Sequence, residues 1–178
     1  MAAEETLSSD IVFEGHIMKV RVDTVRKPDG RQSTREIVEH GEVITVVPVD
    51  ADDNVLMVKQ FRKPLEKELL EIPAGGINPG EDTEAAVIRE MQEEIGFRPG
   101  KLVKLGGFYS APGFCTEYLH LYLATDLTPN QLHAEDTEDI EVVRVPVEQI
   151  PELVTSQKLE DAKSIAGLLA YLEYRKTH

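Results

Sequence analysis

The sequence predicts a single α+β domain, and three observations support this. The 178 residues are enough for one domain of ordinary size with its own core, and too few for two comfortable ones. Apolar residues make up 41% and charged residues 29%, the balance of a folded globular protein rather than of a disordered chain. Short β-branched runs recur along the chain together with two segments of helical periodicity, and no repeat or low-complexity linker separates them.

Strands are expected through most of the chain. Residues 11–26 are strand-like, and the turn signal Pro28-Asp29-Gly30 leads to a second extended run at 34–39, which predicts an N-terminal hairpin. The later β-branched and apolar runs predict, in chain order, a second hairpin from 43–49 and 55–60, a short run at 69–72 that ends in a loop at 73–76, and strands at 102–109, 118–125 and 140–146.

Two helices are expected. The first spans about Thr83 to Ile95, with Asp82 as its N-cap and Gly96 as its stop. The second covers residues 161–174, where four apolar side chains recur at helical spacing: Ile165, Leu168, Leu169 and Leu172.

Acidic residues outnumber basic ones, and this imbalance excludes two classes of partner. Lys and Arg number 19 against 33 Asp and Glu, which gives a formal net charge of -14. Duplex DNA and anionic membranes both require a basic surface, so neither a nucleic acid nor a membrane is expected as a partner. The single cysteine, Cys115, suits a reducing compartment, and no apolar run reaches the length of a membrane span. We therefore expect a cytoplasmic protein.

Many of the acids lie in two short windows. Residues 66–96 hold nine Asp and Glu, and residues 130–141 hold five with no Lys or Arg. Solvated acidic faces are one interpretation of such runs. The other is a set of oxygen ligands for a hard divalent cation such as Mg2+, which prefers carboxylates and water.

The first helix is predicted to place carboxylates on one side and apolar residues on the other. At about 100° per residue, Glu90, Glu93 and Glu94 fall within an arc of roughly 100°. Like charges at this spacing repel one another, and a bound cation would compensate for the repulsion. Pairing of Arg89 with one of the acids is the structural alternative. The apolar side, within roughly 120° on nearly the opposite face, consists of Ala85, Ile88, Met91 and Ile95.

The helix and the loop before it together form a specific motif. It runs Gly75-x5-Glu81-x7-Arg89-Glu90-Met91-x-Glu93-Glu94-x-Gly96-Phe97. This segment resembles the Nudix box, the signature of hydrolases that act on a nucleoside diphosphate linked to another group, and every specified position is filled. The resemblance implies the Nudix α/β/α sandwich, with a mixed central sheet and an N-terminal strand extension. It also implies that residues 1–40 serve in dimerisation as part of the same unit, and that residues 41–178 form the hydrolase domain.

The resemblance further assigns the residues that would hold Mg2+, with Mn2+ or another divalent cation able to replace it. In this family the arginine at the position of Arg89 orients a glutamate by ion pairing. Glu81, near the start of the helix, would have a structural role. The implied metal ligands are Glu90 and Glu94 as the principal pair, Glu93 for a further ion, and the carbonyl of Ala74 to complete the shell.

More of the chain resembles one branch of the family, the ADP-ribose pyrophosphatases. The run from Glu68 to Gly75 is similar to the segment that leads into the box in that branch. The branch also has a proline about sixteen residues past the box glycine, and here Pro112 follows Gly96 by 16. The resemblance therefore extends well beyond the box.

This branch also implies a set of substrate-binding residues. Arg62 would contact a substrate phosphate, or else pair with Glu66 or Glu68. The other implied residues are Gly76, Pro112 and Gly113, together with Arg35 and Glu36, which would reach the adenosine part from the partner subunit of a swapped dimer.

The second acidic window has a candidate role in the chemistry. Pyrophosphate cleavage needs an activated water near metal-bound phosphate, and a carboxylate on a loop is a reasonable general base. The sequence here resembles the segment that supplies this glutamate in the branch, which indicates Glu138 as a catalytic residue beside Glu93 and Arg89. Asp136 and Glu141 are the alternatives.

The predicted function is the Mg2+-dependent hydrolysis of ADP-ribose to AMP and ribose 5-phosphate by a homodimer. One alternative is a Nudix hydrolase of another nucleoside diphosphate sugar. A second is a non-catalytic Nudix domain that binds ADP-ribose as a sensor, although a pure binder has no need of all three helix carboxylates.

Overall fold

The structure, a computed structural model, describes residues 3–134 and 139–178. Its internal contacts divide the chain into two compact units, and the second of them contains the whole motif. The first unit comprises Met1–Glu42 and Tyr109–Tyr118, and the second comprises Val43–Phe108 and Leu119–His178.

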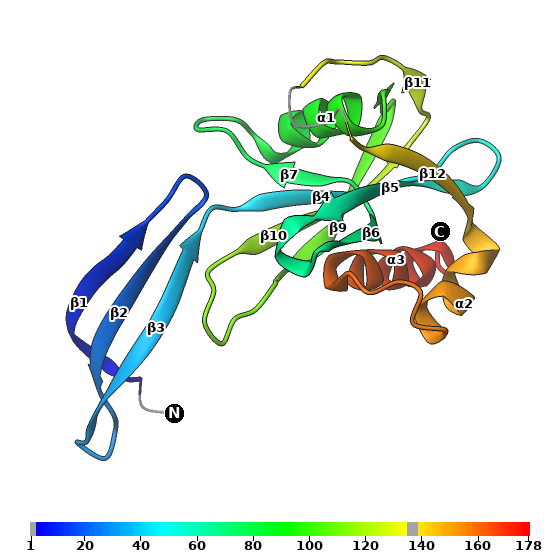
Figure 1. The fold of residues 1–178 in the computed structure, drawn as a ribbon. Helices are drawn as coiled ribbons and strands as arrows, with labels where there is room; N and C mark the ends of the chain where they lie inside the picture. Colours follow the sequence, from blue (N-terminus) through cyan, green and yellow to red (C-terminus); the bar gives the residue numbers. More distant parts are fainter. Residues whose placement is uncertain (1–2, 135–138) are drawn as a thin grey trace. The chain divides into compact units, whose positions relative to one another are not determined.

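The first unit is built on a three-stranded antiparallel sheet (Figure 1). The predicted turn before the third strand is confirmed, because Gly30 has a positive φ of 84° and its amide donates to the carbonyl of Lys27 at 2.9 Å. The single strand expected over residues 11–26 is wrong, because a turn that begins at Gly15 divides this stretch between two strands. The strands, in sheet order, are β1 (Glu5–Glu14), β2 (Met18–Arg26) and β3 (Gln32–His40).

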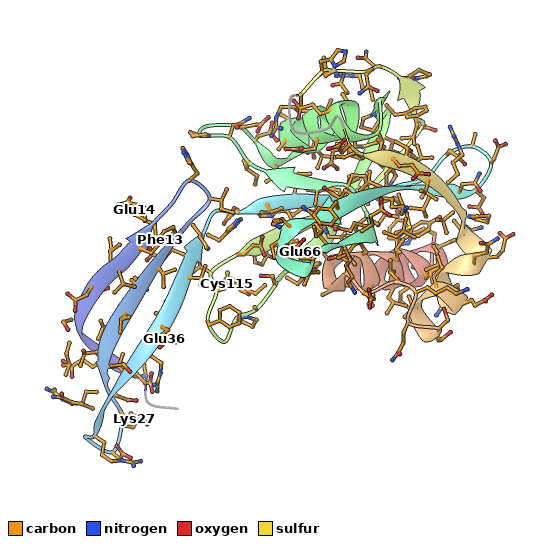
Figure 2. The ribbon with its side chains drawn as sticks, viewed as in Figure 1. Phe13, Glu14, Lys27, Glu36, Glu66 and Cys115 are labelled. Atoms are coloured by element: carbon orange, nitrogen blue, oxygen red, sulfur yellow. The ribbon has the colours of Figure 1, made fainter. Side chains whose placement is uncertain are left out.

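Residues 110–117 also belong to the first unit and run alongside β3. The amide of Val38 donates to the carbonyl of Phe114 at 2.7 Å, and the amide of Thr116 donates to the carbonyl of Val38 at 3.0 Å. Cys115 lies in this loop, as Figure 2 shows. The loop is therefore fixed to the sheet by backbone hydrogen bonds.

The second unit contains two larger sheets and one short strand pair. The mixed sheet has the order β7 (Ala74–Gly76), β4 (Val43–Pro48), β10 (Tyr118–Thr125) and β9 (Lys101–Tyr109). In it, β4 runs parallel to β10 and antiparallel to β7. The antiparallel sheet has the order β12 (Glu141–Pro146), β5 (Asn54–Arg62) and β6 (Lys67–Glu71), and the short pair is β8 (Phe97–Arg98) with β11 (Thr128–Pro129).

Two predictions about this unit are wrong. β4 and β5 do not form a hairpin, because they lie in different sheets, and the ladder between them is reduced to an isolated bridge between Val49 and Val55. Residues 74–76, expected to be part of a loop, form β7 at the edge of the mixed sheet. Both strands of the expected hairpin are buried on both faces, so their apolar runs do not show which strand each one pairs with.

Helices cover both sides of these sheets, with α1 (Thr83–Glu94) on one side and α2 (Ile150–Thr155) and α3 (Ala162–Arg175) on the other (Figure 1). Successive residues of β4 therefore enter two different cores. Ile44 and Val46 pack in the core that includes α1, whereas Val47 packs in the core that includes α2 and α3. The predicted α/β/α sandwich with a mixed sheet and an N-terminal strand extension is confirmed. The described residues also include the short 3-10 helices η1 (Lys63–Leu65) and η3 (Val147–Gln149).

Both predicted helices are confirmed, together with the predicted N-cap and stop of the first. The carboxylate of Asp82 accepts from the amide of Glu84 at 2.8 Å, and α1 stops before Gly96, whose φ is 76°. Asp161 caps α3 by accepting from the amide of Ser164 at 3.0 Å. Over residues 3–134 and 139–178, no helix combines the length and the apolar character that a membrane span requires.

Candidate active site

The segment that leads into the motif is fixed to the mixed sheet. The carbonyl of Pro73 accepts from the amide of Val46 at 3.0 Å and from the hydroxyl of Thr45 at 3.2 Å. β7 continues the attachment, with Ala74 opposite Thr45 in the antiparallel register. The main chain at Ala74, whose carbonyl is a predicted metal ligand, is therefore held in place by the sheet.

Gly75 leaves room for a carboxylate of α1. A Cβ placed on Gly75 would lie 2.0 Å from the carboxyl carbon of Glu90 and 2.1 Å from its Oε1. The φ of Gly75 is not positive, so glycine is needed here for close approach rather than for an unusual backbone conformation. The position brings the Glu90 carboxylate directly against the backbone of β7.

The sequence predicted that the carboxylates of α1 lie opposite its apolar side, and this prediction is wrong. Met91 is buried and Ile88 is partly buried as expected, but Ala85 is exposed, and Ala86 and Val87 are buried instead. Both Ala86 and Val87 pack against the sheet that also borders the glutamates. The buried arc of the helix therefore extends to both sides of the carboxylates, so Glu90 and Glu94 are partly enclosed rather than solvated.

Arg89 binds three of the four glutamates of the motif. Its Nε and Nη2 each donate to one carboxylate oxygen of Glu81 at 3.0 Å. Its Nη1 donates to Glu90 at 2.6 Å and to Glu93 at 3.0 Å, and its Nη2 also donates to the carbonyl of Gly76 at 2.8 Å. A single guanidinium thus fixes three carboxylates and the end of β7.

Glu94 is in a different environment from these three acids. Its Oε2 accepts from the amide of Ala74 at 3.2 Å. Burial raises the pKa of Glu94 to about 8, and repulsion from Glu90 adds to this effect. Burial also raises the pKa of Glu90, although the contact with Arg89 opposes it. Both carboxylates are therefore held where their charged forms are disfavoured.

We call Glu81, Arg89, Glu90, Glu93 and Glu94 the acid-rich cluster, because it holds four carboxylates and one cation, Arg89, which binds three of them. Among the described residues, no group of three or more Asp, Glu, His or Cys is already arranged around a metal position. Arg89 occupies one oxygen of Glu90 and one of Glu93. The donor chemistry fits a hard divalent cation, because all the available ligands are oxygens and a cation would compensate for the disfavoured charge of Glu94.

Arg62 pairs with Glu71, which the sequence had not indicated as its partner. Its Nε donates to Oε1 at 2.6 Å and its Nη2 donates to Oε2 at 2.7 Å, a bidentate pair. The predicted alternative partners are wrong, because both bind lysines: Glu66 binds Lys63, and Glu68 binds Lys59.

Four of the predicted substrate residues lie in the first unit. Arg35 and Glu36 are neighbours on β3, and Figure 2 shows the exposed Glu36 on that strand. Arg35 is bound to Glu4, with its Nε donating at 3.0 Å. Pro112 and Gly113 are exposed in the loop that runs alongside β3. The predicted site residues are therefore distributed over both units.

Of the three acids considered as the general base, the structure describes one. Glu138 and Asp136 lie outside the described residues. Glu141 begins β12, is exposed, and has its Oε2 3.9 Å from the Nζ of Lys59 on the neighbouring strand.

Comparison with known families identifies the motif. The NUDIX domain model matches residues 39–168 of the chain. The chain belongs to the NUDIX domain family. A second model, described as a nucleoside diphosphate sugar hydrolase N-terminal domain, matches residues 4–38. The predicted family is thereby confirmed, and the matched residues include the segment that forms the acid-rich cluster.

Individual relatives match over nearly the whole chain. This NUDIX protein is 39% identical over 175 residues to an ADP-ribose pyrophosphatase of Bacillus subtilis (strain 168), which covers 97% of this chain and 94% of that protein. It is 32% identical, with the same coverage, to a methanol dehydrogenase activator of Bacillus methanolicus. A crystal structure of an ADP compounds hydrolase covers 99% of this chain and 96% of that chain with a TM-score of 0.92 at 23% identity, which shows a shared fold.

Proposed function

We propose that this NUDIX protein hydrolyses the pyrophosphate bond of ADP-ribose to give AMP and ribose 5-phosphate, with Mg2+ as its cofactor. The observation that supports this most strongly is the acid-rich cluster, which holds four carboxylates and one cation beside a glycine that admits Glu90. The 39% identity to an ADP-ribose pyrophosphatase supports the choice of substrate. Conditions inside the cytoplasm, where thiols stay reduced, suit its single cysteine.

The proposed metal ligands all lie within the acid-rich cluster and β7. Mg2+, or Mn2+ or another divalent cation in its place, supplies charge neutralisation of the phosphates and acidification of a water. Ala74 offers its carbonyl and lies beside Glu94, to which its amide donates. Glu90 and Glu94 serve as the principal ligands, and Glu93 serves a further ion.

Arg89 acts in this proposal as the residue that orients the glutamates. Its guanidinium binds Glu81, which in turn accepts from the amide of Asn78 at 2.9 Å, so the cation is tied to the loop before α1. It thereby aligns Glu90 and Glu93 on one side of the helix. Glu81 has the structural role that its position near the helix start suggests.

Glu138 is the proposed general base, which takes a proton from the attacking water. Asp136 and Glu141 are the alternatives. Glu141 is the weaker of these, because its carboxylate lies near Lys59 on the exposed side of β12.

The proposed substrate-binding residues are those that the resemblance to ADP-ribose pyrophosphatases implies. Arg62 contacts a substrate phosphate, and Gly76, Pro112 and Gly113 are further substrate-binding residues. Arg35 and Glu36 contact the adenosine part across a homodimer in which residues 1–40 form the interface. The match of residues 4–38 to the N-terminal domain of nucleoside diphosphate sugar hydrolases supports this use of the first unit.

The test is product analysis with ADP-ribose, ADP-glucose and GDP-mannose side by side at saturating Mg2+. We expect AMP and ribose 5-phosphate from ADP-ribose at a rate well above that of the other two substrates. If another nucleoside diphosphate sugar were cleaved faster, that compound would be assigned as the substrate in place of ADP-ribose. Binding of ADP-ribose with no cleavage of any of the three would instead indicate a sensor.

A further inference from the structure

A second charged cluster lies at the N-terminal end of α3, outside the family motif. We call it the balanced cluster, because it joins two carboxylates and two cations. Glu71 stands at its centre with only 2% of its side chain exposed. It accepts from Arg62 through both oxygens and from the ammonium group of Lys163, which also binds Asp161 at 2.9 Å. The members are Arg62, Glu71, Asp161 and Lys163.

The same turn of α3 holds the main chain that leads into the motif. The hydroxyl of the buried Ser164 accepts from the amide of Ile72 at 2.8 Å, and Asp161 accepts from the amide and the hydroxyl of Ser164. Two residues further on, the amide of Ala74 donates to Glu94. The balanced cluster is therefore anchored immediately before the proposed metal-binding segment.

Arg62 connects the two clusters. Its side chain is 40% exposed, and its charge interacts with Glu94 as well as with Glu71. The bonds to Glu71 use Nε and Nη2. Because the guanidinium is planar and its donors have a fixed geometry, the position of Glu71 determines the direction of the remaining Nη1 group.

Lys163 keeps Glu71 ionised and in place. Burial alone would favour the neutral acid, but contacts with Arg62 and Lys163 hold the pKa of Glu71 below its ordinary value. Removing Lys163 would leave two carboxylates, Glu71 and Asp161, beside a single cation. Glu71 would then have lost one of the two groups that fix its orientation.

We propose that Lys163 is a positioning residue for substrate binding: by fixing Glu71, it directs the Nη1 group of Arg62 toward the pyrophosphate of a nucleoside diphosphate sugar. The inference rests on the proposed role of Arg62 as a phosphate contact. It adds to the site a residue of α3 that lies far from the motif in sequence.

A double-mutant cycle between Lys163 and Arg62 tests this proposal. The proteins are wild type, Lys163→Met, Arg62→Ala and the double variant, with Lys163→Arg as the conservative replacement. Lys176→Met is the matched control, because Lys176 follows α3 and forms an exposed ion pair with Glu173. The readouts are KM and kcat with Mg2+, and the dissociation constant of ADP-ribose measured by calorimetry in EDTA.

We expect Lys163→Met to raise both KM and the dissociation constant about tenfold, with a smaller change in kcat. Lys163→Arg should recover most of the loss, and Lys176→Met should leave both constants unchanged. In the Arg62→Ala background, Lys163→Met should have no further effect. Where Lys163→Met does not fold, Lys163→Gln completes the same cycle.

Equal effects of Lys163→Met with and without Arg62 would overturn the proposal, since Lys163 would then act independently of Arg62. Unchanged constants in the otherwise wild-type protein would overturn it as well. Failure of the proposed function is a separate outcome, because wild type itself would then release no AMP from ADP-ribose.

Discussion

The two charged clusters of the second unit differ in how well their charges are matched. In the balanced cluster two carboxylates meet two cations, and the pKa of Glu71 is lowered despite its burial. In the acid-rich cluster Arg89 binds three of the four carboxylates. Burial raises the pKa of Glu94 to about 8 despite the opposing charges of Lys163 and Arg62, and it raises the pKa of Glu90 above its ordinary value. Glu71 of the balanced cluster precedes Ala74 by three residues, and the amide of Ala74 donates to Glu94 of the acid-rich cluster.

The difference shows what each cluster is suited to do. Buried ions are tolerated when their charges and hydrogen bonds are matched, and they are costly when one charge is left over. The balanced cluster meets this condition with the protein's own side chains. The acid-rich cluster does not, so its unmatched carboxylates are suited to an added cation. The same substitution, glutamate to glutamine, should therefore have opposite consequences in the two places.

Glu94→Gln is expected to have the largest effect on activity. It removes a proposed metal ligand, so kcat with Mg2+ should fall about 1000-fold, while the fold is retained because glutamine fills the same space. AMP release and circular dichroism measure the two quantities. Glu84→Gln, at an exposed glutamate in the first turn of the same helix, is the control and should leave kcat unchanged. Full activity in Glu94→Gln would refute the metal assignment.

Glu71→Gln is expected to act on stability first. It leaves Arg62 and Lys163 without their shared carboxylate, so the free energy of unfolding should fall by about 3 kcal/mol. In the metal-free protein, Glu94→Gln should leave the free energy of unfolding unchanged or raise it. Urea unfolding at pH 8 in EDTA compares the two variants. If both substitutions destabilise the protein equally, the distinction between the clusters is wrong.

Glu138→Gln tests whether turnover requires an acid that belongs to neither cluster. Removal of a general base should slow hydrolysis by roughly 100-fold with little change in KM. Glu141→Gln, measured in parallel, should have a much smaller effect, because this residue lies near Lys59 on β12. The reverse order of effects would move the role of base to Glu141.

Local signals predicted much of the fold and of the acid-rich cluster. Asp82 and Gly96 marked the ends of α1 because caps act within one turn, and the spacing of the motif identified Gly75 and the glutamates of α1. Strand partners were less accessible, because strands that are covered on both faces give continuous apolar runs. The predicted apolar side of α1 also misplaced Ala85, which is exposed while Ala86 is buried, because the buried arc of this helix extends to both sides of its carboxylates.

The balanced cluster was not predictable from the sequence. Glu71 and Lys163 are 92 residues apart, and their contact depends on how α3 packs against the sheets. Neither residue belongs to a periodic pattern that would single it out. The sequence indicated Arg62 as a substrate-binding residue, but the nearby glutamates expected as its alternative partners bind lysines instead.

The most direct measurement of whether the acid-rich cluster is a cation site is the free energy of urea unfolding against pH, with and without Mg2+. The pKa of Glu94 is raised from 4.5 to about 8, so in EDTA its contribution to stability is complete below about pH 4.5 and is lost as the pH rises through 8. This loss should be larger in wild type than in Glu94→Gln. At pH 8, Mg2+ should restore the stability of wild type and have little effect on Glu94→Gln. Equal stabilisation of both proteins by Mg2+, or the same pH dependence in both, would contradict a cation site at Glu94.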